Sequence, residues 1–160
     1  MYNDQGGAPN GQTFVRTITI IHAALLIGQV LFGIVAFVDT KSTGFNLKLG
    51  SDPFFYIVPF LIVAGMLSGS FLFTDQISKA VDKNSLSEKL AGYQTALIIR
   101  FAIAEGPSLL GIVGYMLTGN VIYLILVGFN VIYFILIRPT KDKIGEDLSL
   151  TNDEKNAMGI

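Results

Sequence analysis

Apolar residues gather in four long runs along the chain, with polar positions between them. The runs cover 14–38, 54–73, 92–117 and 121–137. Each approaches the ~20 residues that a helix needs to cross ~30 Å of hydrocarbon. Apolar side chains occupy every face of these runs, unlike the alternating strands of a membrane barrel. The pattern therefore predicts an all-α membrane protein with four transmembrane helices.

The third helix is expected to begin before its apolar run. The stretch "SLSE" matches a capping box, with Ser85 as the N-cap and Glu88 three residues later. We therefore expect this helix to cover 86–117 and to project beyond the bilayer or tilt.

The connections divide the chain into a membrane domain and a tail. Only 118–120 link the last two helices, which must then be antiparallel neighbours. The stretch "TNDE" at 151–154 matches a second capping box, which fits either a short terminal helix or a frayed polar tail. We expect a four-helix transmembrane domain over 1–139 and a polar cytoplasmic tail over 140–160.

Basic residues predict the orientation. Those near the helix ends on one expected side are Arg16, Lys79, Lys83, Lys89, Arg138, Lys141 and Lys143. The other loops carry only Lys41 and Lys48. By the positive-inside rule, both termini are expected in the cytoplasm.

Composition agrees with a membrane protein and narrows its chemistry. The chain is 51% hydrophobic and 14% charged, with a mean hydropathy of +0.58. The net charge of −1 and the lack of a basic stripe argue against nucleic acid as a partner. The absence of cysteine excludes disulfides, thiolate metal sites and cysteine nucleophiles. The first residues do not resemble a signal peptide, so the first helix is expected to remain in the mature protein.

An internal repeat relates the first and third helices. A shift of 78 residues places "TITIIHAALLIGQVLFGIVAFVDT" over "TALIIRFAIAEGPSLLGIVGYMLT", with ten identities in 24 positions and no gap. Gly28 then aligns with Gly106, and Gly33 with Gly111. The repeat predicts two tandem helical hairpins in which the first and third helices are parallel equivalents and these glycines serve helix packing.

Glu105 is an acidic residue inside an apolar run, in "AIAEGPSLLG". If the helix enters the hydrocarbon near Tyr93, Glu105 lies ~18 Å further on, close to the midplane. A charge there costs at least ~2.5–3.5 kcal/mol on insertion scales. Glu105 is therefore either a reversible H⁺ or Na⁺ site, a hydrogen-bonding group that holds helices together, or a contact for substrate or lipid.

Polar side chains in the other runs are candidate partners for this carboxyl group. The candidates that complete an ion-binding set with Glu105 are Gln29, Ser68, Asn130 and Tyr133. Each can equally serve as a hydrogen-bonding residue between helices. Gln29 is the strongest candidate, because it lies two positions from the site that aligns with Glu105 in the repeat.

His22 and Arg100 are candidates for a proton relay. His22 has no second histidine or acidic residue at i+3 or i+4, so no metal site is expected, and it can also cap or snorkel. Arg100 lies ~140° around the helix from Glu105 and can snorkel outward. Pro107 removes the helical hydrogen bond to the carbonyl of Ile103, which either exposes a carbonyl for an ion or bends the helix.

Small residues predict close packing of the second and third helices. Gly65 and Gly69 form a GxxxG step, which lets helix backbones approach. Ala104, Ser108 and Gly111 offer a matching face on the third helix. The contact is expected within one chain or between chains.

The stretch "AEGPSLLGIVGYML" resembles the carboxylate helix of the proteolipid (c or K) subunits of V-type and F-type rotary ATPases. There a Glu is followed six residues later by a Gly, as Glu105 is by Gly111 here. V-type proteolipids are also similar in length, in having four helices from a duplicated hairpin, and in keeping the carboxylate in one copy. The resemblance implies an oligomeric ring whose Glu carries H⁺ or Na⁺. In that family the carboxylate lies on the second helix of a hairpin, whereas here it lies on the third helix.

Three functions follow from these features. The first is an ion-binding subunit in a homo-oligomer or larger membrane complex, with no cofactor besides H⁺ or Na⁺. The second is a structural or accessory subunit, and the third a small dimeric transporter. An enzyme is not expected, because one His, no Cys and one buried acid form no recognisable catalytic set. The expected location is a bacterial inner membrane, with lipid as a partner.

Overall fold

The computed structural model describes residues 11–40 and 52–159, and its regular structure is helical throughout these ranges. The helices are α1 (Gly11–Asp39), α2 (Phe54–Val81), α3 (Leu86–Thr118), α4 (Ile122–Leu136), α5 (Lys141–Asp147) and α6 (Asn152–Met158). In this part of the chain there are six helices and no strand.

Three of the described helices, α1, α2 and α3, are long and apolar enough to cross a membrane. The helix α4 has 15 residues, or ~22 Å at the helical rise. It reaches the length of a span only together with α5, from which it is bent by 74°. Pro139 follows the end of α4 and lacks the N–H group that a continuing helix needs. The chain thus has three spans by length and composition, or four if α4 and α5 count as one.

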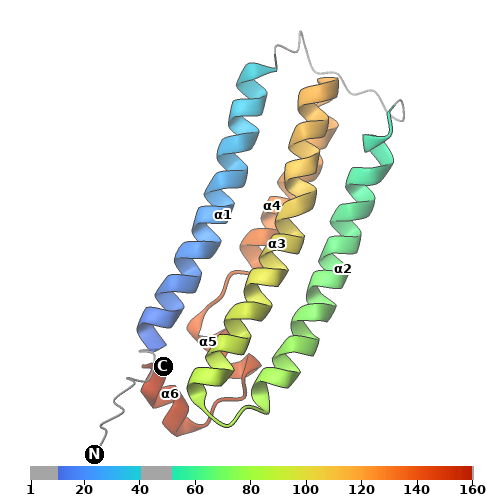
Figure 1. Cartoon of the computed structure of the whole chain (residues 1–160). Coiled ribbons are helices and arrows are strands. Elements are labelled where there is room, and N and C mark those ends of the chain that lie inside the picture. The colour runs from blue at the N-terminus through green and yellow to red at the C-terminus, as the bar shows by residue number, and fades with distance from the viewer. Residues whose placement is uncertain (1–10, 41–51, 160) are drawn as a thin grey trace, which may run out of the picture.

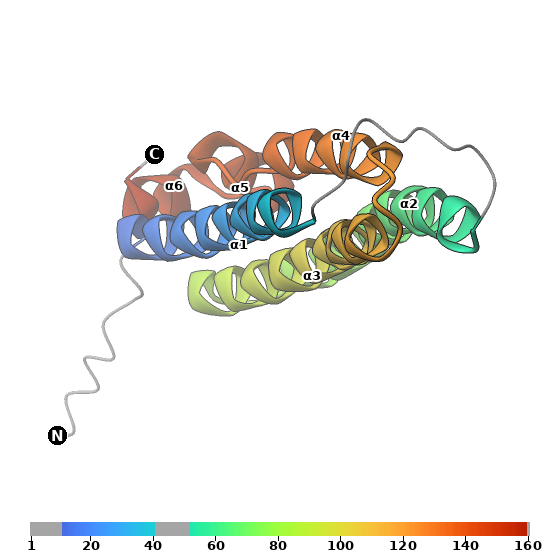
Figure 2. The same cartoon turned by 90° about the horizontal axis from the view of Figure 1, so that it is seen from above.

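Helix α3 lies at the centre of the bundle, with α1 on one side and α2 on the other (Figure 1). The view from above shows α4 beside α1, closing the bundle (Figure 2). Helices α1 and α3 run in the same direction, as the repeat predicts. However, α1 packs chiefly on α3 and α4, so α1 and α2 do not form the packed hairpin that we expected.

The most extensive helix contact joins α2 to α3. A Cβ atom added at Gly65 would lie 3.2 Å from the carbonyl oxygen of Ile103 and 3.5 Å from Pro107. At Gly69 it would lie 3.4 Å from the Ile103 side chain. The GxxxG step therefore faces the turn of α3 whose carbonyl Pro107 leaves free.

The small residues that we expected opposite this step lie elsewhere on α3. Ala104 and Ser108 instead meet Asn130 of α4. Gly111 faces both neighbours, since an added Cβ atom would lie 2.6 Å from Val127 of α4 and 3.4 Å from Val58 of α2. This glycine lets three helices meet.

The glycines of the repeat differ in their surroundings. An added Cβ atom at Gly28 or Gly106 would meet nothing within 4 Å, and at Gly33 only Ile112, at 3.9 Å. The structure therefore shows no close helix approach at Gly28 or Gly106 within the described part of the chain. Gly33 and Ile112 are 79 residues apart in the sequence, one more than the 78-residue offset of the repeat. Helices α1 and α3 therefore pack nearly in the register of the repeat.

A short turn makes α3 and α4 antiparallel neighbours. Gly119 ends α3 in the left-handed conformation with φ of 68°, which glycine adopts without a steric penalty. The hydroxyl of Thr118 accepts from the backbone N–H of Asn120, and the Asn120 side chain accepts from that of Ile122. These bonds fix the turn.

The last residues fold back on the end of the bundle at which α1 and α3 begin (Figure 1). They bury four apolar side chains in the same core as the start of α3: Ile144, Leu148, Leu150 and Met158. An added Cβ atom at Gly11 would overlap the Met158 Cα atom, so α1 and α6 are in backbone contact. The segment that we expected to be a polar tail therefore forms a packed cap, composed of α5 and α6.

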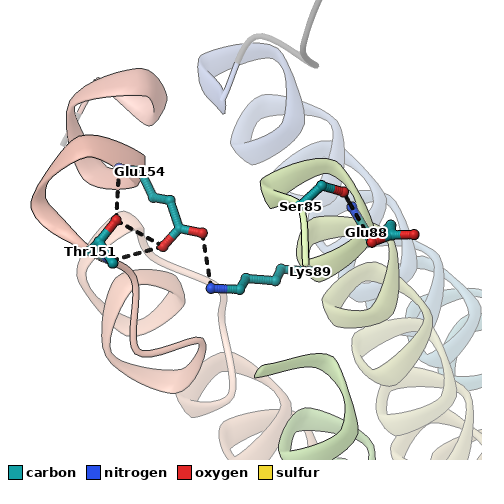
Figure 3. Close-up of polar contacts among 5 residues, drawn as sticks. All are labelled: Ser85, Glu88, Lys89, Thr151 and Glu154. Atoms are coloured by element: carbon teal, nitrogen blue, oxygen red, sulfur yellow. Dashed lines mark hydrogen bonds and ion pairs between the residues drawn. The ribbon is translucent and has the colours of Figure 1, made fainter. Parts of the chain in front are cut away.

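Polar contacts fasten this cap (Figure 3). Thr151 and Glu154 form the capping box that "TNDE" predicts, at the start of α6. Glu154 also accepts a hydrogen bond of 2.9 Å from Lys89 of α3. Ser85 caps α3 by accepting from the backbone N–H of Glu88, while its hydroxyl donates to the Glu88 carboxylate. Helix α2 continues to Val81, beyond the expected end at residue 73, and so reaches the same layer.

Candidate functional site

Glu105 lies at the edge of the bundle, on the side of α3 next to α1. It follows Phe101 by four residues and precedes Ile112 by seven, and those two residues contact His22 and Gly33 of α1. The side chain is partly buried, whereas its neighbours Ala104 and Gly106 are buried and exposed, respectively. Within the described ranges, Glu105 makes no hydrogen bond and no ion pair.

A hydrogen-bonded clamp holds the turn of α3 that carries Glu105. Asn130 of α4 is 1% exposed. Its Nδ2 donates to the carbonyl oxygen of Ala104 at 2.6 Å and to Ser108 Oγ at 2.7 Å. A buried amide in an apolar bundle is costly unless it is paired in this way. We call these three groups the Asn130 clamp; it ties α4 to the residues on either side of Glu105.

Gln29 of α1 is a second buried amide, also 1% exposed. Unlike Asn130, neither its Nε2 nor its Oε1 has a hydrogen-bond partner among the described residues. Gln29 follows His22 by seven residues, and Glu105 follows Phe101 by four. Because His22 and Phe101 are in contact, Gln29 and Glu105 lie within about one helical turn of each other along the bundle.

His22 is held in place by aromatic rings and one hydrogen bond. Its ring stacks on Phe134 at 4.8 Å and meets Phe101 edge-on at 5.0 Å. Its Nε2–H donates to the carbonyl oxygen of Phe134 at 2.8 Å. That carbonyl lies in the last turn of α4, where helical partners run out. His22 therefore caps the end of another helix, a contact that the sequence alone does not reveal.

Arg100 and Tyr133 meet at a different level from Glu105. Tyr133 shares a hydrogen bond of 3.3 Å with Ser70, and Arg100 Nη2 donates to the same hydroxyl at 3.5 Å. The Arg100 guanidinium also lies 4.7 Å above the ring of Phe73. These contacts hold Tyr133 and Arg100 toward α2.

The expected ion-binding set is thus divided in space. The structure brings Gln29 and Asn130 to the level of Glu105, whereas Ser68 lies on the exposed face of α2. Ser108 joins the clamp through its hydroxyl, although in sequence it has only the signature of a small packing residue. In the described ranges, no group of three or more His, Cys, Asp or Glu residues is placed to hold a metal ion.

Comparison of the chain with protein-family models, with curated proteins and with solved structures found no match. The similarity to rotary-ATPase proteolipids therefore stays a prediction from the sequence. The chemistry of the site rests on the residues described above.

Proposed function

We propose that this chain is an integral membrane protein that binds and releases H⁺ or Na⁺ at Glu105. The observation that carries the proposal is an acidic side chain in the middle of an apolar helix without a partner in the described chain. An unpaired carboxylate at this depth is costly, so it is expected to hold a proton or a cation. Release then requires a path or a partner that stabilises the charged form.

Gln29 is proposed as the second polar group of this site. A neutral amide supplies one carbonyl oxygen and two N–H donors. Its buried position at the level of Glu105, with no partner of its own in the described chain, supports this role. The carbonyl suits a cation shared with Glu105, and the N–H groups suit the carboxylate after release.

The Asn130 clamp bears on the alternative function, in which Glu105 only holds helices together. That function expects an interhelical hydrogen bond from Glu105, and Asn130 makes such bonds at this level instead. This favours the ion site over the structural one. The partly buried edge leaves room for a neighbouring helix, so a homo-oligomer or a complex with other membrane subunits is part of the proposal.

We further propose four membrane crossings with both termini in the cytoplasm, in a bacterial inner membrane. The start of α1, the turn between α2 and α3, and the cap lie at one end of the bundle, which supports a common side for both termini (Figure 1). Basic residues gather at this end, and the positive-inside rule assigns it to the cytoplasm. Lys41 and Lys48, the basic residues expected on the opposite side, lie outside the described residues.

Carbodiimide labelling of membrane vesicles tests the ion site. The reagent modifies protonated carboxyl groups in apolar surroundings, so wild-type protein should be labelled at Glu105, less at higher pH or with Na⁺. The variant E105Q should lose the labelling, and E146Q, at an exposed position of α5, should keep it. Mass spectrometry of the peptides identifies the labelled residue.

A second variant tests the role of Gln29. Q29L replaces the amide with an apolar side chain of similar size. Glu105 should still be labelled in this variant, but protection by Na⁺ should weaken severalfold. Two results with folded wild-type protein would refute an exchangeable ion at Glu105: labelling that does not change with pH or Na⁺, or no labelling at any pH.

A further inference from the structure

A second polar region lies at the end of the bundle, away from Glu105. A cavity of about 290 Å³ opens where α4 ends and α5 begins, and α2 and α3 complete its walls. We call it the interfacial cavity. Its apolar lining includes Phe73, Leu97 and Leu136, and its polar lining includes three cations and one carboxylate. Apolar and cationic groups thus face one space.

The charges of this cavity are unbalanced. Its cations are Arg100, Arg138 and Lys143, and its acid is Asp147. The Asp147 carboxylate accepts a hydrogen bond of 3.0 Å from Tyr93. Among the residues that the structure describes, none of the three cations has an acidic partner within 4.0 Å, the two ion pairs being Lys79–Asp75 and Lys89–Glu154. The cavity therefore has an excess of two positive charges.

Arg100, in the wall of this cavity, has a buried donor without a partner in the described chain. Its guanidinium rests on Phe73 and makes one long hydrogen bond, to Ser70. Its Nε is buried and has no partner in the described chain. Lys143 is partly engaged, since its ammonium donates to the carbonyl oxygens of Leu136 at 3.0 Å and Arg138 at 3.4 Å. A buried guanidinium donor calls for an acceptor.

We propose that the interfacial cavity binds the phosphate group of an anionic phospholipid from the leaflet on the side of the cap. Guanidinium groups match phosphate oxygens in geometry and charge, and a lysine adds a point charge. Basic pockets between membrane helices on the cytoplasmic side are suited to such head groups. The volume lies near the lower limit of small-molecule sites, which fits a head group rather than a whole lipid.

The apolar side of the cavity favours a lipid over a free phosphate ion. Leu136 is 67% exposed, on the outer face of α4 beside the cavity. An acyl chain can follow this face while the phosphate reaches the cations. A soluble phosphate would gain nothing from these apolar residues.

Binding measurements on the full chain in detergent test this proposal. Native mass spectrometry would count bound phosphatidylglycerol, with phosphatidylcholine as the zwitterionic comparison and glycerol phosphate as the soluble one. Wild-type protein should retain phosphatidylglycerol at least tenfold more strongly than phosphatidylcholine, and glycerol phosphate should not displace it.

Paired variants separate the cavity from general surface charge. R138Q/K143Q removes two cations that line the cavity, and should weaken phosphatidylglycerol binding on the order of tenfold. R16Q/K83Q removes an Arg and a Lys at the same end of the bundle but outside the cavity. It should change phosphatidylglycerol binding less than twofold. Equal losses in both pairs would overturn the proposal in favour of diffuse attraction.

A measurement on the wild-type protein covers the case in which R138Q/K143Q fails to fold. A phosphatidylglycerol with a photoreactive head group should crosslink to peptides that contain 136–147. Crosslinks spread over other helices, or tighter binding of glycerol phosphate than of the lipid, would refute the lipid site.

Discussion

Two buried amides illustrate how single residues shape this bundle. Asn130 has partners for its N–H groups, which donate to the α3 backbone and to Ser108. Gln29 is buried to the same extent but has no partner in the described residues. Buried amides normally find partners, so the first is explained by stability and the second asks for a ligand.

Replacing Asn130 should destabilise the bundle. N130A removes two hydrogen bonds to α3, and interhelical bonds of this kind contribute ~0.6 kcal/mol on average in a membrane, up to ~1.7. We expect a loss of about 1–2 kcal/mol in unfolding by sodium dodecyl sulfate, followed by circular dichroism. A change of less than ~0.3 kcal/mol would contradict a stabilising clamp.

Replacing Gln29 should have the opposite effect on stability. Q29L removes a buried polar group that has no partner, so the free energy of unfolding should stay the same or rise by up to ~1–2 kcal/mol. The same unfolding assay measures it. A clear loss of stability would mean that the amide is paired in the folded protein.

At the scale of elements, α3 is the helix around which the others pack. Glycines set how closely they approach, and their positions on α3 and α2 are readable in the sequence. The sequence does not show which neighbouring helix each position meets. Ile103 faces α2, whereas the next residue, Ala104, faces α4. Adjacent residues on a helix point ~100° apart, so one step along the sequence changes the partner helix.

Gly111 offers a test of this packing. G111A would place a methyl group 2.6 Å from Val127, and overpacking of this kind costs about 1–3 kcal/mol. The double variant G111A/V127A should recover part of that loss, as seen in the unfolding assay. G106A is the matched control, because the added methyl group meets nothing within 4 Å and alanine favours the helix. Equal losses at both glycines would contradict the contact with α4.

At the scale of the whole molecule, the cap joins the last helices of the chain to the starts of α1 and α3. It contacts the start of α1 at Gly11 and the start of α3 at Lys89. The cap also supplies Lys143 and Asp147 to the interfacial cavity, so the cavity depends on the docked α5. A segment that is polar in sequence thereby completes a surface at one end of the bundle.

The contribution of Glu154 to this docking should depend on pH. The hydrogen bond from Lys89, with a further contribution from the Thr151 backbone, holds the pKa of Glu154 below its ordinary value of 4.5. Its stabilising effect is therefore present above the ordinary value and is lost as the pH falls through the lower pKa of the folded state. The free energy of unfolding of the wild type should exceed that of E154Q by up to about 1 kcal/mol at neutral pH.

Thermal unfolding of both proteins between pH 3 and 7 measures this difference. It should shrink as the pH falls below about 4.5. E146Q, at an exposed position of the cap, serves as the control and should follow the wild type. A constant difference between wild type and E154Q across the range would show that the ion pair does not act through ionisation.

The sequence by itself determined that the chain is helical and suited to a membrane, because an apolar run must satisfy its backbone within its own helix. It also determined the cap at Ser85, the short antiparallel link over 118–120 and the position of Glu105 within an apolar run, since these depend on neighbouring residues alone. The stretch "TNDE" fitted either a short helix or a frayed tail, and the structure decided for the helix.

Only the tertiary structure decided which side chains meet. Contacts such as His22 with Phe134, Lys89 with Glu154 and Asn130 with Ala104 join residues far apart in the chain. They depend on the relative rotation and register of packed helices, which an apolar pattern on every face does not specify. For the same reason, the packed cap and its cavity emerge from the fold and not from the polar composition of the last residues.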